Sequence, residues 1–184
     1  MRRTLVIVKP DGINRCLIGD VITRFEKKGL KLIGLKMDLL KVYQLKDHYV
    51  HLQDKPFYEE LLEYMSSIPC VLLALEGKDA VAVVRKLVGS TNARDADIGT
   101  IRGDYAMSVQ TNIVHASETE DAAEEELKRF FKDEELFEYD KMNFNWLYCN
   151  SEQGKYDHVE NEGKSSEAEY FEEKEEIKKD KENE

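Results

Sequence analysis

The sequence has few cysteines, no long hydrophobic run and no excess of positive charge. Its three cysteines, Cys16, Cys70 and Cys149, form an odd, scattered set that fits a reducing compartment better than a disulfide framework. Their spacing also offers no zinc site. The first apolar run stops after five residues, at Lys9, which is too short for a signal peptide, and no stretch approaches transmembrane length. These features lead us to expect a cytoplasmic protein.

The charge balance is acidic. Asp and Glu number 38 against 27 Lys and Arg, so the formal net charge is -11. Such a surface argues against general binding to nucleic acid or to an anionic membrane, but it leaves room for a small basic pocket that holds a phosphate ligand. The chain is 41% hydrophobic, which is enough for a substantial core.

The composition divides the chain into a domain at residues 1–150 and an acidic tail at residues 151–184. The tail carries 13 Asp and Glu against 6 Lys and has few apolar side chains. It cannot bury enough surface to offset the entropy lost on ordering. We expect a flexible or partly helical extension, which is either a solvated tail or a segment that docks on a partner.

Apolar periodicity predicts alternating strands and helices in the domain. The predicted strands are Thr4–Val8, Leu30–Leu40, Cys70–Leu75 and a short strand within Ser108–His115. The predicted helices are Gly19–Lys28, Leu45–Gln53, Phe57–Ser66, Asp79–Val88 and Glu118–Phe131. A turn at Lys-Pro-Asp-Gly follows the first strand, and 92–105 reads as a long polar loop of the kind that is usually functional. The pattern predicts an α+β sandwich with helices on a small sheet, and it does not fix the strand order.

His115 is the first candidate for chemistry. It ends an apolar run just before a predicted helix, for which Ser117 is a plausible N-cap and Glu120 would complete a capping box. Imidazole is a competent nucleophile toward phosphorus, and Glu126 on the next helix could hold the ring in one tautomer. A single histidine at a strand end is also a common structural residue, so the residues alone leave both interpretations open.

Five other side chains suit a phosphate or nucleotide ligand but have ordinary structural explanations. Arg102 lies between two glycines and could present its planar fork to phosphate oxygens, or it could pair with a nearby acid. Lys9 ends a strand, where a substrate contact and a solvated lysine are equally common. By spacing alone Arg85 is a solvated charge, and Phe57, like Tyr49, is an aromatic packed on the core.

Taken together, the motifs resemble the nucleoside diphosphate kinases from Thr4 to about Tyr148. The matching segments are TLVIVKPDG, GDVITRFEKKGLKLIGLKM, HYVHLQDKPFYEEL, VRKLVGSTN, GTIRGDYA, NIVHASE and NWLY. The resemblance implies a ferredoxin-like α/β sandwich, in which helices cover an antiparallel four-stranded βαββαβ sheet. It implies transfer of a γ-phosphoryl group from a nucleoside triphosphate to a nucleoside diphosphate by a ping-pong route. The acidic C-terminal extension has no counterpart in this pattern.

The resemblance also implies roles for individual residues. His115 would carry the phosphoryl group, Glu126 and Ser117 would orient its ring, and Tyr49 would lie beside it. Lys9 would contact both the ribose and the phosphates. The implied nucleotide ligands are Asn112 for the ribose, Arg85, Thr91 and Arg102 for the β- and γ-phosphates, and Phe57, Leu61 and Val109 for the base. Stacking on Phe57 implies broad base tolerance, and Mg²⁺ would arrive on the nucleotide phosphates with no protein ligand required.

Departures from the pattern concern the assembly. Members of the family commonly have proline where this chain has Ala93 and Ile98, in a loop that makes trimer contacts in hexameric members; Ala116 replaces a frequent glycine. The resemblance implies a homo-oligomer, a hexamer in the first instance, with tetramer and dimer as alternatives. Two other functions stay open: a catalytically silent relative that acts as a nucleotide-binding or scaffold protein, and a nucleic-acid-binding module, which the acidic charge disfavours.

Overall fold

The computed structural model describes residues 1–141, 144–149 and 151–152. They fall into two units, Met1–Lys141 and the described residues beyond it, and each is described by itself. The first unit contains strands β1 (Arg2–Val8), β2 (Lys31–Asp38), β3 (Cys70–Gly77) and β4 (Val114–Ala116). Its helices are α1 (Pro10–Asn14), α2 (Ile18–Lys28), α3 (Val42–His48), α4 (Tyr58–Ser66), α5 (Ala80–Val88), α6 (Ile101–Tyr105) and α7 (Glu120–Phe130), with 3-10 turns η1 (Val50–Leu52), η2 (Ala93–Asp95) and η3 (Asp133–Glu135).

The second unit contributes one short helix, α8 (Phe144–Leu147). The predicted tail lies outside the described residues, apart from Ser151 and Glu152. No helix in the part of the chain that the structure describes is long and apolar enough to cross a membrane.

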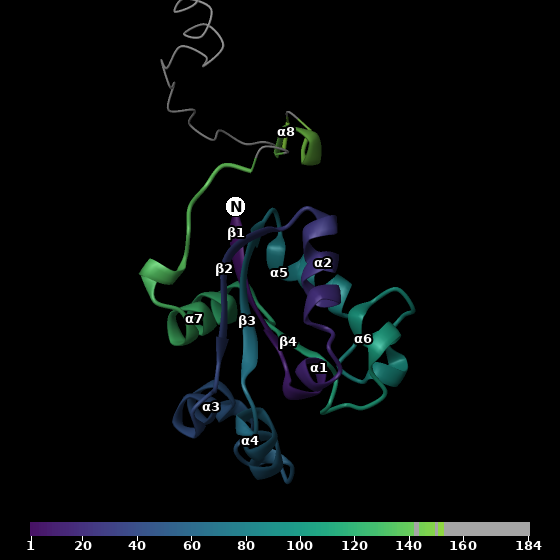
Figure 1. Ribbon diagram of the computed structural model, residues 1–184, viewed down its shortest axis with the longest axis vertical. Helices are drawn as coiled ribbons and strands as arrows, with labels where there is room; N and C mark the ends of the chain where they lie inside the picture. The colour runs from purple at the N-terminus through teal and green to yellow at the C-terminus, as the bar shows by residue number, and fades with distance from the viewer. Residues whose placement is uncertain (142–143, 150, 153–184) are drawn as a thin grey trace, which may run out of the picture. The chain divides into compact units, whose positions relative to one another are not determined.

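The four strands form one antiparallel sheet in the order β2-β3-β1-β4 (Figure 1). With α2 after β1 and α5 after β3, the chain follows the βαββαβ order of a ferredoxin-like fold, and α3 and α4 are inserted between β2 and β3. The expected fold class is therefore confirmed. Strand β1 occupies the centre of the sheet, so residues at its C-terminal end lie beside β4, the short edge strand.

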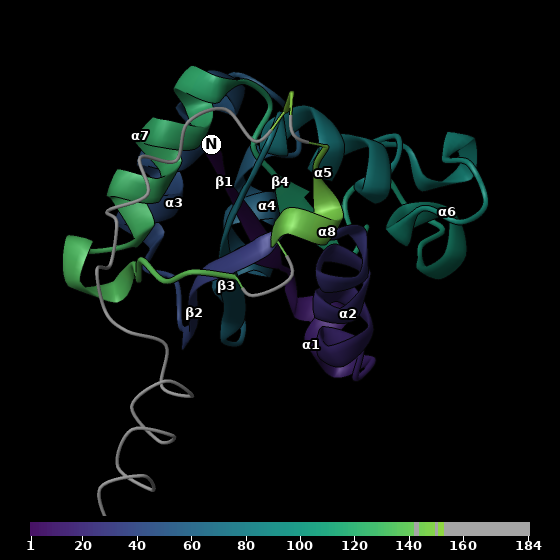
Figure 2. The ribbon, with the colours of Figure 1, turned by 90° about the horizontal axis from the view of Figure 1, so that it is seen from above.

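Helices cover both faces of the sheet because β1 alternates between two apolar clusters. Val6 and Val8 belong to the core that contains the apolar residues of α2 and α5. Leu5 and Ile7 belong to the opposite core, with the apolar residues of α3, α4 and α7. Figure 2 shows α3 and α7 on one side of the strands and α2 on the other. Every residue of β1 from Thr4 onward is fully buried, so the strand is a fixed base for the residues directly after it.

Two local predictions are wrong in detail. The predicted turn after β1 is the one-turn helix α1, because Pro10 at its first position has no N–H to lose and a φ suited to a helix. The predicted loop at 92–105 contains η2 and α6. Thr100 starts α6 by accepting a hydrogen bond from the Gly103 N–H at 3.0 Å. Both short helices lie next to residues that the sequence marks as functional.

The predicted capping box at Ser117 and Glu120 is also wrong. Thr119 is the N-cap of α7, and its Oγ1 accepts a hydrogen bond from the Ala122 N–H at 3.1 Å. Ser117 is fully buried, and its hydroxyl points to Glu126 and to the backbone of Leu5. Because the Ser117 hydroxyl is used in these buried hydrogen bonds, it does not cap α7, and Thr119 caps the helix instead.

Candidate active site

His115 occupies the middle of β4, opposite Ile7 of β1. Its neighbours Val114 and Ala116 point into the core beneath α2 and α5, so the alternation of the strand turns His115 toward α7. The imidazole is partly exposed, whereas the residues on either side of it are buried. A partly exposed ring on a fixed strand can meet a ligand without a rearrangement of the fold.

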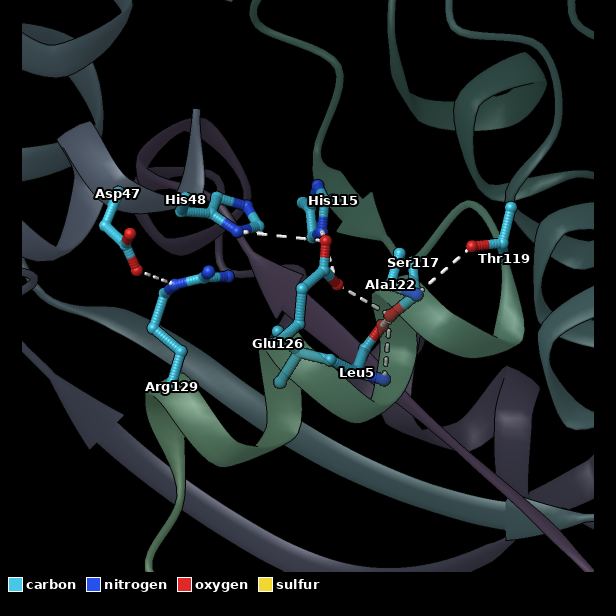
Figure 3. Close-up of polar contacts among 9 residues, drawn as sticks. All are labelled: Leu5, Asp47, His48, His115, Ser117, Thr119, Ala122, Glu126 and Arg129. Carbon is cyan, nitrogen blue, oxygen red and sulfur yellow. Dashed lines mark hydrogen bonds and ion pairs between the residues drawn. The ribbon is translucent and has the colours of Figure 1, made fainter. Parts of the chain in front are cut away.

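The Glu126 carboxylate on α7 holds the His115 ring in place (Figure 3). Nε2 of His115 lies 3.2 Å from Oε1 and 3.1 Å from Oε2 of Glu126. A carboxylate is an acceptor only, so the imidazole proton resides on Nε2. Nδ1 of His115 is then left with its lone pair, which is the form of the ring that a nucleophile requires.

Ser117 completes the support of the carboxylate. Its hydroxyl donates to Oε2 of Glu126 at 2.7 Å, and its oxygen accepts from the Leu5 N–H at 3.2 Å. Burial raises the pKa of Glu126, but the hydrogen bonds and charge interaction from His115, together with the Ser117 hydroxyl, outweigh it, and the net pKa lies below its ordinary value. Glu126 is therefore ionised at neutral pH and acts as a fixed acceptor.

Two aromatic rings from the end of α3 pack beside His115. The Tyr49 ring lies edge-on, 6.3 Å from the His115 ring, and burial raises the pKa of its hydroxyl, so it stays neutral. The His48 ring lies closer, at 4.6 Å between centroids and 79° between planes. Sequence reasoning singled out Tyr49 and missed His48. The only signal for His48 in the sequence is that it directly precedes Tyr49 in the HYVH segment.

Lys9 follows β1 directly and is a buried cation, 7% exposed. Its ammonium donates to Oδ1 of Asn112 at 2.7 Å and to the Gln110 carbonyl at 3.1 Å, both neutral oxygens. Burial, and after it the charge of Arg102, lowers the pKa of Lys9 to about 8. A cation buried on neutral partners has unused affinity for an anion.

Asn112 connects three segments of the candidate site through one side-chain amide. Its oxygen accepts from Lys9, while its nitrogen donates to the Thr91 carbonyl and to the Val109 carbonyl, each at 2.8 Å. The side chain is almost fully buried. The structure thus brings Lys9, Thr91 and Val109 around Asn112, which has its donors occupied and only oxygen lone-pair capacity left for a ligand.

Arg102 on α6 is a second buried cation. Its terminal nitrogens donate to the carbonyls of Gly89, at 3.0 Å, and Val114, at 2.8 Å, and its buried Nε has no partner. Burial, followed by the charge of Arg85 on α5, lowers the pKa of Arg102 to about 10. Arg85 is exposed. Lys9, Arg102 and Arg85 therefore form a chain of mutually repelling cations in an acidic protein, an arrangement that an anion would relieve.

The Lys-Pro-Asp-Gly motif fixes the segment before His115. Asp11 accepts hydrogen bonds from the Ile113 N–H, at 3.0 Å, and from the Tyr64 hydroxyl. Ile113 has φ +72°, an unfavourable conformation for a β-branched residue. A Cβ on Gly12 would lie 2.8 Å from Val8 and 3.2 Å from the Ile113 carbonyl, so only glycine allows this approach. The motif therefore holds a strained residue two positions before the nucleophile candidate.

The residues expected around a base come from two segments. Phe57 directly precedes α4 and is 41% exposed, and its carbonyl accepts the Leu61 N–H at 2.9 Å. Val109 is half exposed on the loop that Asn112 ties to Lys9. Leu61 is a core residue beneath α3 and α7 rather than a surface one. Phe57 and Val109 are thus the members of this set with apolar surface available to a ligand.

One group of described side chains could place three donor atoms around a metal ion. The donor atoms of His48, His115 and Glu126 lie within 4.8 Å of one another. Two imidazoles and one carboxylate suit a transition metal and not Mg²⁺, which prefers octahedral oxygen ligands. A metal at this point would also displace the Nε2 proton of His115.

Comparison with known proteins agrees with this geometry. Residues 2–136 match the family model described as nucleoside diphosphate kinase. The chain is 55% identical over 152 residues to a nucleoside diphosphate kinase of Parabacteroides distasonis, which covers 83% of this chain and 99% of the relative. It is 45% identical over 148 residues to one of Archaeoglobus fulgidus, covering 80% of this chain and 98% of the relative.

Solved structures show the same likeness. A halophilic nucleoside diphosphate kinase from Halobacterium salinarum, in complex with CDP, matches with a TM-score of 0.78 and 44% identity over 80% of this chain and 98% of that chain. A nucleoside diphosphate kinase of Encephalitozoon cuniculi, an apo form, matches with a TM-score of 0.78 and 42% identity over 80% of this chain and 100% of that chain. The chain is therefore an enzyme of the nucleoside diphosphate kinase family.

Proposed function

We propose that this enzyme transfers the γ-phosphoryl group by a ping-pong route in which His115 carries it. The observation that supports this most directly is the pairing of Nε2 of His115 with both oxygens of Glu126, at 3.2 and 3.1 Å. The pairing keeps the lone pair of Nδ1 available, so attack needs no prior proton transfer.

The bond changes balance without an added acid or base. The Nδ1 lone pair of His115 forms a bond to the γ-phosphorus, the bond to the β,γ-bridging oxygen breaks, and its electron pair leaves on the nucleoside diphosphate. The imidazole keeps its Nε2 proton and gains positive charge, which the Glu126 carboxylate stabilises. A second diphosphate attacks the phosphohistidine, and the same steps in reverse release a triphosphate.

Three cations would neutralise the phosphates. Lys9 and Arg102 are buried without a carboxylate partner, and each has a pKa lowered first by burial, to about 8 and about 10 respectively. Phosphate oxygens would supply the missing counter-charge, and Arg85 would extend the contact at the exposed end of the set. Thr91, in the segment after α5, would add a contact to the phosphates. Asn112 would offer its side-chain oxygen to the ribose.

Enzymes of this family generally use a divalent metal. We propose that Mg²⁺ would enter as part of the substrate, where it would neutralise part of the phosphate charge. The imidazole-rich group of His48, His115 and Glu126 supports this, since its donor set does not fit Mg²⁺. Phe57 would stack on the base, and because every base has a π-face the site would accept purines and pyrimidines, with ribose or deoxyribose.

We propose a homo-oligomer, with a hexamer as the first form to test and a tetramer or dimer as alternatives. Strand β2 lies at the edge of the sheet and exposes Leu35 and Met37, and Leu39 directly after the strand is also exposed, so this apolar edge is open to pairing with a second copy. The segments before and after α6 also expose large apolar side chains, Ile98 and Met107 respectively. Free, exposed Cys16 and Cys149 support a reducing, cytoplasmic setting.

The test is direct labelling of the protein with γ-labelled ATP and Mg²⁺, followed by a chase with unlabelled GDP. We expect an acid-labile, alkali-stable label that transfers to GTP. His115→Ala should lower labelling and transfer by at least about a thousandfold. His51→Ala, which removes an exposed histidine of η1, is the matched control and should label normally. An unlabelled wild-type protein would favour the silent scaffold, and a labelled His115→Ala protein would place the carrier elsewhere.

A further inference from the structure

His48, at the end of α3, is a buried histidine with no hydrogen-bond partner. It is 5% exposed, and neither ring nitrogen has a partner within hydrogen-bonding distance. Its ring contacts His115 at 4.6 Å and Phe130 at 5.1 Å, both edge to face. Buried polar groups are nearly always paired, so an unpaired imidazole beside the nucleophile calls for a physical explanation.

The electrostatic surroundings fix the protonation state of His48. Burial, and after it the charge of His115, lowers the pKa of His48 to about 3, so the ring is neutral at physiological pH and carries one N–H. Nδ1 of His48 lies 3.8 Å from Oε1 of Glu126. A dashed line marks this contact in Figure 3. A proton on Nδ1 faces that anion, whereas a proton on Nε2 would be buried without an acceptor. The Nδ1–H form is therefore favoured.

The Glu126 carboxylate has room for this third donor. Oε2 accepts from Ser117 at 2.7 Å, and both oxygens share the Nε2 proton of His115. Oε1 keeps acceptor capacity on the side that faces His48. The arrangement places a neutral dipole, not a competing cation, against the carboxylate that orients the nucleophile.

We propose that His48 is a positioning residue for phosphoryl transfer, which acts as a neutral Nδ1–H donor to Glu126 and as a wall against the His115 ring. The inference rests on the proposed role of His115 as the phosphoryl carrier. The donor would hold the Glu126 carboxylate in the orientation that keeps the Nε2–H of His115 aligned while the imidazole gains positive charge. Because His48 is neutral, it competes with His115 for the charge of Glu126 less than a cation at this position would.

The proposal predicts a change in pH dependence. Loss of the Nδ1–H donor leaves the Glu126 carboxylate less stabilised and more basic, so it holds a second proton on His115 more firmly. The nucleophilic form then appears only at higher pH. The titratable or charged groups that face this pair, all retained in the variants, are Tyr49, His51 of η1 and Arg129 of α7, the last paired with Asp47.

Three variants of the full chain separate donation from packing. His48→Phe keeps the ring wall and removes the donor. His48→Asn places an amide N–H near the former Nδ1, and His48→Gln places one near the former Nε2. The measurement is the single-turnover rate of phosphorylation by MgATP, by rapid quench from pH 5 to 8, with the KM for MgATP. The phosphates of MgATP titrate identically with every variant, so their effect cancels when the pH–rate profiles of the variants are compared.

We expect His48→Phe to move the acid limb of the rate profile to higher pH by about 0.5 unit and to lower the plateau about three- to tenfold, with KM unchanged. His48→Asn should return the limb to the wild-type position, and His48→Gln should not. An unmoved limb in a folded His48→Phe protein overturns the proposal, as does equal behaviour of the Asn and Gln variants. A wild-type protein that takes no label would instead contradict the proposed function itself.

Discussion

Lys9 shows how a single residue can favour ligand binding at the expense of the free protein. Its pKa in the folded chain is about 8, against 10.5 for an ordinary lysine, with burial as the main cause. Between these values the unfolded chain binds a proton that the folded chain has already released. The free energy of unfolding therefore rises with pH across this interval.

We predict that Lys9→Met abolishes this rise. The gain between about pH 8 and pH 10.5 should be on the order of 1–3 kcal/mol for the wild type, because this is the electrostatic cost of holding the charge. Urea unfolding at a series of pH values measures it, and exposed Lys46→Met is the control. Equal slopes for wild type and Lys9→Met would mean that the ammonium is well solvated in the free enzyme.

Phe57 gives a second test at the level of one side chain. Phe57→Ala should weaken binding by about 1–3 kcal/mol for ATP, GTP and CTP alike, because stacking is not base-selective. Steady-state KM values for the three nucleotides measure this. Tyr43→Ala, which removes an exposed aromatic residue of α3, should leave all three unchanged. A loss confined to one base would mean that specific hydrogen bonds, not stacking, hold the nucleotide.

Motifs predict part of the candidate site, and tertiary structure supplies the rest. The contact between His115 and Glu126 is predictable, because the helix that follows the strand packs back beside it and can bring an acidic side chain to the imidazole. His48 and Asp11 are not, because their importance depends on contacts with Glu126 and Ile113, which are far from them in the sequence. Leu61 lies in the core, and its place in the base slot stays a prediction.

At the level of elements, apolar periodicity predicts the main helices and strands but not the hydrogen bonds that end them. Strand β1 and helix α2 lie close to their predicted positions. The start of α7 differs, because Ser117 bonds to Glu126 and Thr119 caps the helix instead. The order of the strands depends on pairings between distant segments, and periodicity carries no information about these.

The turn before α6 supplies a prediction about stability. The Thr100 N–H donates to the Asp97 carbonyl at 3.1 Å, and Gly99 has φ +92°, which is the pattern of a type II turn with Ile98 at its second position. Proline suits that position, and Ile98 is 94% exposed, so its side chain loses little on replacement. Ile98→Pro should stabilise the enzyme by about 0.4–1 kcal/mol by restricting the unfolded chain.

Thermal unfolding measures the effect, with an expected rise in Tm of about 2–4 °C per kcal/mol. Gly99→Ala is the opposite control, because an alanine at positive φ is strained and should lower the Tm. A lower Tm for Ile98→Pro would show that residue 98 has a φ outside the range of proline.

At the scale of the whole molecule, the charge of the protein and the charge of its site have opposite signs. The net charge is -11, yet Lys9, Arg102 and Arg85 are close enough for their charges to interact. Binding of polyanionic nucleotides must therefore depend on this local cluster and not on the surface as a whole.

The acidic tail should contribute to that balance without entering the chemistry. Deletion of residues 151–184 removes 13 acidic and 6 Lys side chains. We predict that turnover stays within about twofold of the full chain, since no proposed site residue lies in the tail. Steady-state rates of both proteins, with sedimentation to compare their assembly, measure this. A large loss of turnover would place the tail at the site or at a subunit interface.

The single amide of Asn112 has a consequence for how this enzyme can evolve. Its oxygen holds Lys9, and its nitrogen holds the backbone at Thr91 and at Val109. The segments that contain Lys9, Thr91 and Val109 thus share one small group, so a change in any one alters the fit of the others. Libraries that vary these stretches one at a time will recover few active sequences, whereas libraries that vary them jointly can find compensated combinations.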